Sequence, residues 1–252
     1  MIEVQGVCKR YGDQVVVDNI SLAIPQGGIT AVIGPNGAGK STLLSLISRL
    51  IRLDAGRVTV DGLDITTTPS DELARRLAIL RQEHHVESRL TVRDLVSFGR
   101  YPHAKGRLTA ADQVQIANAL AYLDLEPLAD RYLNELSGGQ RQRAFVAMVL
   151  CQDTDYVLLD EPLNSLDIRH AVSMMKRMRQ IADDFGKTVV IVLHDINFAA
   201  CYADRIIAMK DGRVLLEGAP ATVMTPTNLQ ALYDVAVHVE QIGGRPIAVY
   251  YA

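Results

Sequence analysis

Hydrophobic positions in the first quarter of the chain follow the short, closely spaced runs that are typical of β structure. Apolar runs predict strands at residues 2–12, 15–24, 28–34 and 56–62, separated by turns that carry Gly or Pro. Between the last two strands, residues 40–51 place Leu and Ile at helical spacing and predict one helix. The first sixty residues are therefore mostly β structure.

The pattern becomes helical from about residue 90. Helical spacing covers 91–101, 109–125 and 138–152, and strand–helix alternation resumes at residue 156 and leads to a hairpin around Asp211-Gly212. Near-continuous apolar strands that alternate with helices indicate a parallel sheet covered on both faces. We therefore expect an α/β fold with an inserted α-helical block.

These changes of pattern divide the chain into parts of one domain, residues 1–252. The tail beyond residue 220 predicts short helices and a final strand pair around Gly243-Gly244. A chain of this length buries one large core, or one core with a small subdomain. The predicted parts are an α/β core at 1–87 and 152–225, a helical insert at 88–151 and a C-terminal extension at 226–252.

Composition and charge narrow the class of protein. The formal net charge of -3 gives no polycationic surface, so nucleic acid is not expected as a partner. The longest apolar runs, such as 189–193, are far shorter than the roughly 20 residues that span a bilayer. The N-terminus lacks the pattern of a secretory signal, and Cys8, Cys151 and Cys201 are scattered. We expect a soluble cytoplasmic protein.

The predicted strand at 28–34 leads directly into a phosphate-binding sequence. "GPNGAGKS" matches the pattern G-x-x-x-x-G-K-[ST] and opens a predicted helix, which is the context that this motif requires. Its glycines let the backbone wrap phosphates, Lys40 adds a positive charge, and Ser41 can hold Mg²⁺. The predicted nucleotide-binding residues are Gly34, Pro35, Asn36, Gly37, Ala38, Gly39, Lys40, Ser41 and Thr42.

Polar residues end three other predicted strands. Next to a phosphate loop, Asp160 would complete the Mg²⁺ shell and Glu161 would polarise an attacking water. His194 would reach the γ-phosphate region, and the amide of Gln82 could bind Mg²⁺ or orient water. The alternatives are plain capping for the two acids and a structural hydrogen bond for the histidine.

A second anion-binding pattern lies about a hundred residues further on. In "ELSGGQRQR", Ser137 and two glycines precede a predicted helix. Such a helix start offers free backbone N–H groups and a positive dipole end, both of which suit a phosphate.

Taken together and in this order, the motifs closely resemble the ATP-binding subunits of ATP-binding cassette (ABC) transporters. The phosphate loop and Gln82 are followed by "LSGGQ", "LLDEP", "NSLD" and His194, and the resemblance covers essentially the whole chain. It implies a P-loop NTPase (RecA-like) core with an N-terminal antiparallel β region and a helical subdomain. It also implies ATP and Mg²⁺ as cofactors, and an ATPase in which Glu161 activates water while Lys40 and His194 stabilise the γ-phosphate.

The resemblance also implies that two copies of the chain pair head to tail, as a homodimer. Each signature would then cover the ATP that its partner holds, through Ser137, Gly138, Gly139, Gln140 and also Asp167. "NSLD" departs from the family's commoner Ser-Ala-Leu-Asp at Asn164 and Ser165, so we expect modulation of this contact.

Tyr11 occupies the position of the aromatic residue that stacks on adenine in the family. Base stacking on an aromatic ring needs no base-specific hydrogen bond. The alternative is a tyrosine in an ordinary turn, since "KRYGD" also suits a hairpin.

The helical block resembles that of ATPases serving bacterial importers of iron–siderophore complexes, cobalamin and haem. Residues 94–112 carry this likeness to the whole set. Within the set, the segments 48–56, 90–100, 152–167 and 194–199 are most similar to the ferric-siderophore importers, and cobalamin or haem import is the alternative. The likeness implies permease subunits as partners at the cytoplasmic face of the membrane, and indirectly a substrate-binding lipoprotein. The permease would be contacted through Arg100, Tyr101, Pro102 and His103, which could otherwise form a simple loop.

Other classes of ABC protein fit less well. DNA-repair relatives separate the phosphate loop from the signature by very long coiled coils, and translation factors carry two cassettes in one chain. An adaptor that binds ATP without hydrolysing it is disfavoured by Glu161, His194 and Lys40.

The pair His84-His85, with Glu83, raises the possibility of a metal site. Adjacent side chains on an extended segment point apart, and no further ligand cluster with metal spacing is evident. We expect loop residues there.

Overall fold

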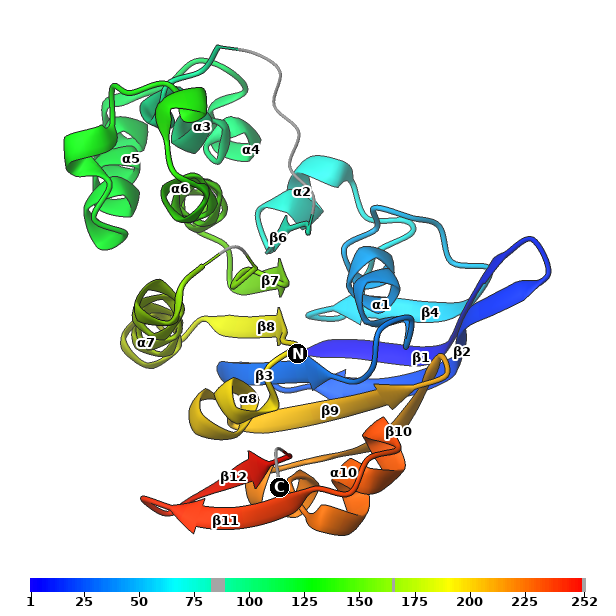
Figure 1. Cartoon of the computed structure of the whole chain (residues 1–252). Coiled ribbons are helices and arrows are strands. Elements are labelled where there is room, and N and C mark those ends of the chain that lie inside the picture. Colours follow the sequence, from blue (N-terminus) through cyan, green and yellow to red (C-terminus); the bar gives the residue numbers. More distant parts are fainter. Residues whose placement is uncertain (83–88, 165, 251–252) are drawn as a thin grey trace.

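A six-stranded sheet runs through the centre of the molecule. The computed structural model describes residues 1–82, 89–164 and 166–250 (Figure 1). The strand order is β10-β9-β3-β8-β7-β6, and all neighbours are parallel except β9 and β10, which form a hairpin. The strands are β3 (Gly28–Ile33), β6 (Leu77–Leu80), β7 (Tyr156–Asp160), β8 (Thr188–Val192), β9 (Arg205–Lys210) and β10 (Arg213–Gly218).

Both faces of this sheet are buried, which explains why its strands are apolar without interruption. In β3, Ile29 and Ala31 face one hydrophobic core while Val32 faces a second core. In β8, Val189 and Val190 divide between the same two cores. The sheet therefore separates two layers of packing.

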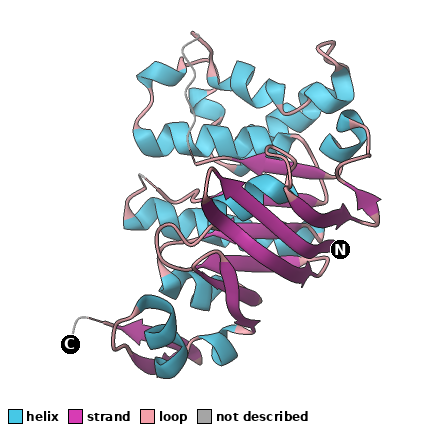
Figure 2. Ribbon diagram, turned by 90° about the vertical axis from the view of Figure 1, so that its right-hand side faces the viewer, coloured by secondary structure: helices cyan, strands magenta, loops and turns pink. Residues whose placement is uncertain are grey.

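The smaller core lies between this sheet and an antiparallel sheet of four strands, in the order β2-β1-β4-β5. Figure 2 shows the long strands of this second sheet side by side on the face turned to the viewer. Helix α1 (Lys40–Ile47) contributes its buried leucines to this core, and the short α2 (Ser70–Ala74) follows β5. The strands are β1 (Ile2–Tyr11), β2 (Gln14–Ile24), β4 (Ala55–Val60) and β5 (Leu63–Asp64).

The helical block is inserted between β6 and β7 and packs into the larger core (Figure 1). Thr91, Thr109 and Ser137 cap three of its helices, each through a side-chain oxygen that accepts from a first-turn N–H. The elements are α3 (Val92–Phe98), α4 (Tyr101–Ala104), α5 (Ala110–Tyr122), α6 (Gly138–Cys151) and the 3-10 turns η1 (Glu126–Leu128) and η2 (Leu133–Glu135).

The remaining helices cover the larger-core face, and the C-terminal elements lie beyond β9 and β10 (Figure 1). Asn197 in α8 exchanges two hydrogen bonds with the backbone of Ala248 and so fixes the last strand to that helix. The elements are α7 (Ile168–Phe185), α8 (Ile196–Tyr202), α9 (Pro220–Val223), α10 (Pro226–Tyr233), β11 (His238–Ile242) and β12 (Arg245–Val249).

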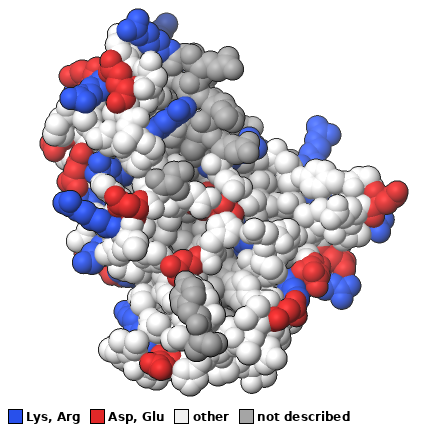
Figure 3. Space-filling view, viewed as in Figure 1, with Lys and Arg blue, Asp and Glu red and all other residues white. Residues whose placement is uncertain are grey.

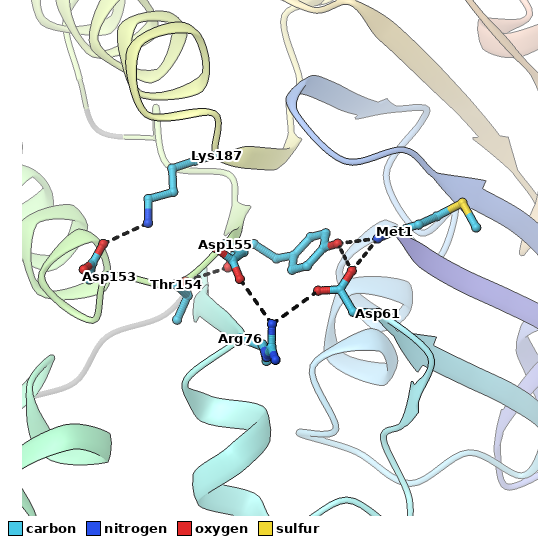
Figure 4. A network of polar contacts seen from close by, with 8 residues as sticks. Met1, Asp61, Arg76, Asp153, Thr154, Asp155 and Lys187 are labelled. Carbon is cyan, nitrogen blue, oxygen red and sulfur yellow. Dashed lines mark hydrogen bonds and ion pairs between the residues drawn. The ribbon is translucent and has the colours of Figure 1, made fainter.

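A polar network joins the two sheets at the start of β7 (Figure 4). The hydroxyl of Tyr156 donates to Asp61, which also accepts from the Met1 amino group at 2.6 Å. Arg76 lies between Asp61 and Asp155, at 3.9 and 3.7 Å. Burial, followed by the hydrogen bond to Asp61, raises the pKa of Tyr156. The hydroxyl therefore stays protonated and serves as a donor at the junction of the sheets.

The predicted α/β class, the N-terminal antiparallel region and the helical insert are confirmed. One detail differs: the helix predicted over 91–101 is divided into α3 and α4. The division falls at Gly99, where a Cβ would lie 2.1 Å from the carbonyl oxygen of Met148, so the chain passes α6 too closely for a side chain.

Candidate functional site

The phosphate loop between β3 and α1 is held by contacts that only glycine permits. Gly34 has φ 146°, and a Cβ there would lie 2.0 Å from the carbonyl oxygen of Met209. Gly39 has φ 92°, and a Cβ there would lie 2.5 Å from the carbonyl oxygen of Val16. The loop is therefore pressed against β9 at its start and against β2 at its end.

Lys40, the first residue of α1, is folded back over this loop. Its ammonium donates to the carbonyl oxygens of Gly34 at 2.8 Å and Pro35 at 2.9 Å. Burial lowers the pKa of Lys40, while Glu161 and Asp160 act in the opposite direction. The positive charge thus lies inside the loop that would surround a phosphate group.

The hydroxyl of Ser41 and the carboxylate of Asp160 lie together beside the phosphate loop. The Ser41 hydroxyl donates to Asp160 Oδ1 at 2.9 Å. Burial raises the pKa of Asp160, and the hydrogen bond from Ser41 opposes this effect. A hydroxyl beside a buried carboxylate is the kind of donor set that Mg²⁺ accepts, and a bound cation would offset the burial of the charge. These two residues therefore fit a magnesium ion.

The carboxylate of Glu161 is the meeting point of three strand ends. It directly follows β7, whose last residue Asp160 is in register with Val192 of β8. Glu161 has φ 52°, a left-handed backbone that is uncommon for a residue with a side chain and is often found at functional sites. The carboxylate is nearly buried, and its three neighbours all lie at 2.6 Å, namely His194 Nε2, Gln82 Nε2 and Asn164 Nδ2.

Lys40 and Ser41, together with Glu161 and its three neighbours, line one cleft of about 440 Å³, a size in the range of small-molecule sites. Lys and Arg are interspersed with Asp and Glu over the face shown in Figure 3. The lining residues are Val16, Asn36, Gly37, Ala38, Gly39, Lys40, Ser41, Thr42, Gln82, Glu161, Asn164 and His194.

Two residues of this cleft had no such role in the sequence-based prediction. The sequence marks Asn164 only as a departure from the commoner Ser-Ala-Leu-Asp loop, yet its amide donates to Glu161. Its position three residues after Glu161, in a turn that follows a strand, is the signal that could have indicated this contact. Val16 reaches the cleft from β2, and no local pattern marks it.

The signature residues lie apart from this cleft. Ser137 caps α6, and its own N–H donates to Gln140 Oε1 at 3.0 Å. Ser137 and Gly138 are exposed, with the free N–H groups of a helix start beside them. Helix α6 packs into the larger core and α1 into the smaller one, and none of Ser137 to Gln140 lines the cleft of the phosphate loop.

Tyr11 and Asp167 are also outside the lining of the cleft, within the part of the chain that the structure describes. Tyr11 ends β1 and is half-exposed, with the Lys9 ammonium 5.6 Å from its ring centroid. Asp167 caps α7, accepts from the His170 N–H at 2.8 Å, and is exposed. Ser165 lies outside the described residues.

The segment from Arg100 to His103 divides into buried and exposed members. Arg100 is only 8% exposed and donates to Asp112 Oδ1 at 2.8 Å and to the Cys151 carbonyl at 2.9 Å. Its guanidinium therefore joins α5 to the end of α6 within the helical block. Tyr101, at 66% exposure, and His103 present their side chains at the surface, and Pro102 is half-buried.

Within residues 1–82, 89–164 and 166–250, no group of three or more His, Cys, Asp and Glu could hold a metal ion. Glu83, His84 and His85 lie outside these ranges. No helix in the same ranges is long and apolar enough to cross a membrane.

Comparison with known proteins gives matches at the level of family, sequence and fold. Residues 17–164 match the family model described as ABC transporter. The chain is 50% identical over 252 residues to the petrobactin import ATP-binding protein YclP of Bacillus subtilis, covering 100% of both chains. It is 39% identical to the ferric enterobactin transport ATP-binding protein FepC of Escherichia coli, covering 95% of this chain and 90% of that one. The dimeric structure of the bacterial ABC transporter cassette MJ0796 matches with a TM-score of 0.79 and 30% identity, covering 87% of this chain and 98% of that one.

Proposed function

The chain belongs to the ABC transporter family, and we propose that it is the ATPase subunit that drives import of ferric siderophores. Relatives that match along almost the whole chain are named for petrobactin import and for ferric enterobactin transport. Their names support iron chelates as the substrate class and do not favour cobalamin or haem.

The observation that carries the ATPase assignment is the environment of Glu161. Its carboxylate is fixed by three side chains in the cleft that Lys40 also lines. A positioned carboxylate can take a proton from an attacking water, and His194 and Lys40 can stabilise the charge of the γ-phosphate. When bound, Mg²⁺ would neutralise phosphate charge, held by Ser41 and Asp160, with Gln82 beside them.

The site is completed, in this proposal, by a second copy of the chain. Ser137 and Gly138 are exposed at the start of α6, and neither lines the chain's own phosphate cleft. A symmetric pair would bring each signature to the partner's nucleotide and would form two identical sites. The MJ0796 cassette, a structural neighbour, is itself dimeric. Asp167 would add a contact across the interface, and Tyr11 would stack on adenine.

Permease subunits are the proposed second partner, at the cytoplasmic face of the membrane. The exposed side chains of Tyr101 and His103 on the helical block are available for this contact, with Pro102 between them. A substrate-binding lipoprotein would act through the permease without touching this chain.

Uptake of radiolabelled iron chelates tests the proposal. A strain that lacks this gene should lose uptake of at least one ferric siderophore, with ferric petrobactin and ferric enterobactin as the first probes. The intact gene should restore uptake, and a Glu161→Gln copy should not. Normal uptake of every ferric siderophore together with loss of cobalamin or haem uptake would overturn the substrate assignment.

A further inference from the structure

The turn between β9 and β10 lies against strand β2 (Figure 1). Asp211 and Gly212 form this two-residue turn, since the residues on either side of it are paired across the hairpin. A Cβ on Gly212 would lie 2.7 Å from the carbonyl oxygen of Val16, so the turn approaches β2 too closely for a side chain. The same carbonyl is the one that leaves no room for a side chain at Gly39 in the phosphate loop.

Hydrogen bonds fasten the turn to β2. The N–H of Asp18 donates to the Gly212 carbonyl at 2.9 Å. Arg213 donates to Asp18 Oδ2 from Nε at 2.8 Å and from Nη2 at 2.6 Å. The backbone and the side chain of Asp18 therefore hold the turn at a fixed place along β2, two residues after Val16.

Val16 connects this turn to the phosphate loop. Its carbonyl oxygen closely approaches both Gly39 and Gly212, and Val16 also lines the cleft. The start of the loop rests on β9 itself, where the carbonyl of Met209 closely approaches Gly34. The β9–β10 hairpin therefore reaches both ends of the loop, directly at Gly34 and through Val16 at Gly39.

We infer that the β9–β10 turn is a positioning element for the nucleotide site. It holds β2 against the phosphate loop, so that Val16 faces a bound nucleotide at a fixed place in the cleft. The inference rests on the proposed ATPase function, and it adds Asp18, Gly212 and Arg213 to the residues on which nucleotide affinity depends. None of these three residues lines the cleft, so each acts through the position of β2.

The Gly212→Ala variant tests this assignment, and Gly62→Ala is its matched control. Both glycines end an Asp-Gly turn of two residues, with φ 76° at Gly212 and 78° at Gly62, so an alanine strains the two backbones alike. A Cβ on Gly62 would have no atom within 4 Å, whereas a Cβ on Gly212 would displace the Val16 carbonyl. The difference between the two variants therefore isolates the contact with β2.

Nucleotide affinity is the quantity that separates a positioning turn from a merely structural one. In the purified full chain, Gly212→Ala should raise the Kd for MgATP and the KM for ATP about tenfold, the smaller end of what one apolar contact is worth to a ligand, with kcat nearly unchanged. Gly62→Ala should keep the Kd and KM of the parent. Both variants should have a lower thermal midpoint, because alanine is strained at a positive φ. A merely structural turn would lower the midpoint and leave the Kd and KM unchanged in both.

The ion pair gives a second test, which does not require the turn to accept a side chain. Asp18→Ala removes the contact with Arg213 and should raise the Kd for MgATP about twofold to fivefold, the worth of one exposed ion pair. Glu217→Ala is its control, because Glu217 pairs with Arg205 at 2.8 Å toward the other end of the same hairpin, and its Kd should equal that of the parent. Combining Asp18→Ala with Gly212→Ala should raise the Kd by less than the product of the two effects, since both act through β2.

The inference is overturned if the parent hydrolyses ATP and Gly212→Ala has the Kd of Gly62→Ala, or Asp18→Ala has the Kd of Glu217→Ala. If Gly212→Ala does not fold, the comparison of Asp18→Ala with Glu217→Ala decides alone. A parent chain without ATPase activity would instead contradict the proposed function itself. The two failures are therefore distinguishable in one set of assays.

Discussion

At the scale of single residues, the proposed ATP hydrolysis depends on how the fold holds Glu161. Its backbone is in the left-handed region, and its carboxylate has three neighbours at 2.6 Å. Two of these are amides, which donate to the carboxylate whatever the pH. The carboxylate is thereby oriented before substrate arrives, which is the condition for efficient general-base catalysis.

Glu161→Gln should lower steady-state ATP hydrolysis by about a hundredfold or more, the usual contribution of a general base. The side chain keeps its shape but can no longer accept a proton from water. MgATP affinity should stay close to that of the parent, because no phosphate-loop contact is removed. Phosphate release and nucleotide titration measure the two quantities.

Asn164→Ala provides the matched comparison, since it leaves the carboxylate in place and removes one donor. Its hydrolysis rate should lie between those of the parent and Glu161→Gln. Unchanged hydrolysis in Glu161→Gln would contradict the assignment of the base.

Residues with strong local patterns could be predicted from the sequence, and residues brought in by long-range packing could not. Each of the predicted catalytic residues ends a predicted strand or begins a predicted helix, and Lys40, Glu161, Gln82 and His194 meet in one cleft. Asp160 is joined to this cleft through its hydrogen bond from Ser41. The contact of α10 with β9 carries no motif, and it depends on Lys210, which donates to Ala231 and Asp234 at the end of α10.

At the scale of elements, the helical block depends on a buried ion pair between Arg100 and Asp112. Asp112 sits in the first turn of α5, where Thr109 donates to it from both its N–H and its hydroxyl. These bonds, followed by that from Arg100, lower the pKa of Asp112 to about 2. The pair joins α5 to the segment between α3 and α4, and through the Cys151 carbonyl to the end of α6.

The lowered pKa predicts a pH dependence of stability that Asp112→Asn removes. Since the folded pKa lies below the ordinary value of 3.8, the carboxylate stabilises the fold fully above that value, and less as the pH falls toward about 2. The parent should therefore exceed Asp112→Asn in free energy of unfolding at pH 7, and the difference should shrink at pH 3. Urea denaturation at the two pH values measures this difference in free energy of unfolding. A difference of the same size at pH 7 and pH 3 would contradict the role of this carboxylate.

The same region shows what limits prediction of elements from sequence. Helical periodicity at 91–101 continues through Gly99, but the chain bends there because α6 passes within contact distance of its backbone. Family resemblance predicts Arg100 at a permease surface. The residues next to Arg100 in the sequence do not indicate that its side chain is buried in an ion pair with Asp112.

At the scale of the whole molecule, the signature lies apart from the phosphate cleft, since none of Ser137 to Gln140 lines it. In the proposed pair, each chain would present half of each of two sites, and the second copy would supply the missing half.

The Ser137→Arg variant should keep its affinity for MgATP and lose ATP hydrolysis. In the isolated subunit, MgATP affinity should remain near that of the parent, because Ser137 does not line its own cleft. Hydrolysis should fall by about a hundredfold or more, since a group that stabilises charge in the partner's site is replaced by a bulky one. Lys40→Ala is the comparison, and it should lose affinity. An equal loss of affinity in Ser137→Arg would show that the signature serves its own nucleotide.

Sedimentation of Glu161→Gln with and without MgATP tests the composite site most directly. The single chain has a mass of 27.6 kDa. The proposed pairing predicts that MgATP doubles this mass, and that Glu161→Gln combined with Ser137→Arg binds MgATP but keeps the mass of one chain. A Glu161→Gln chain that binds MgATP and stays single, or a double variant that pairs as well as Glu161→Gln alone, would contradict it.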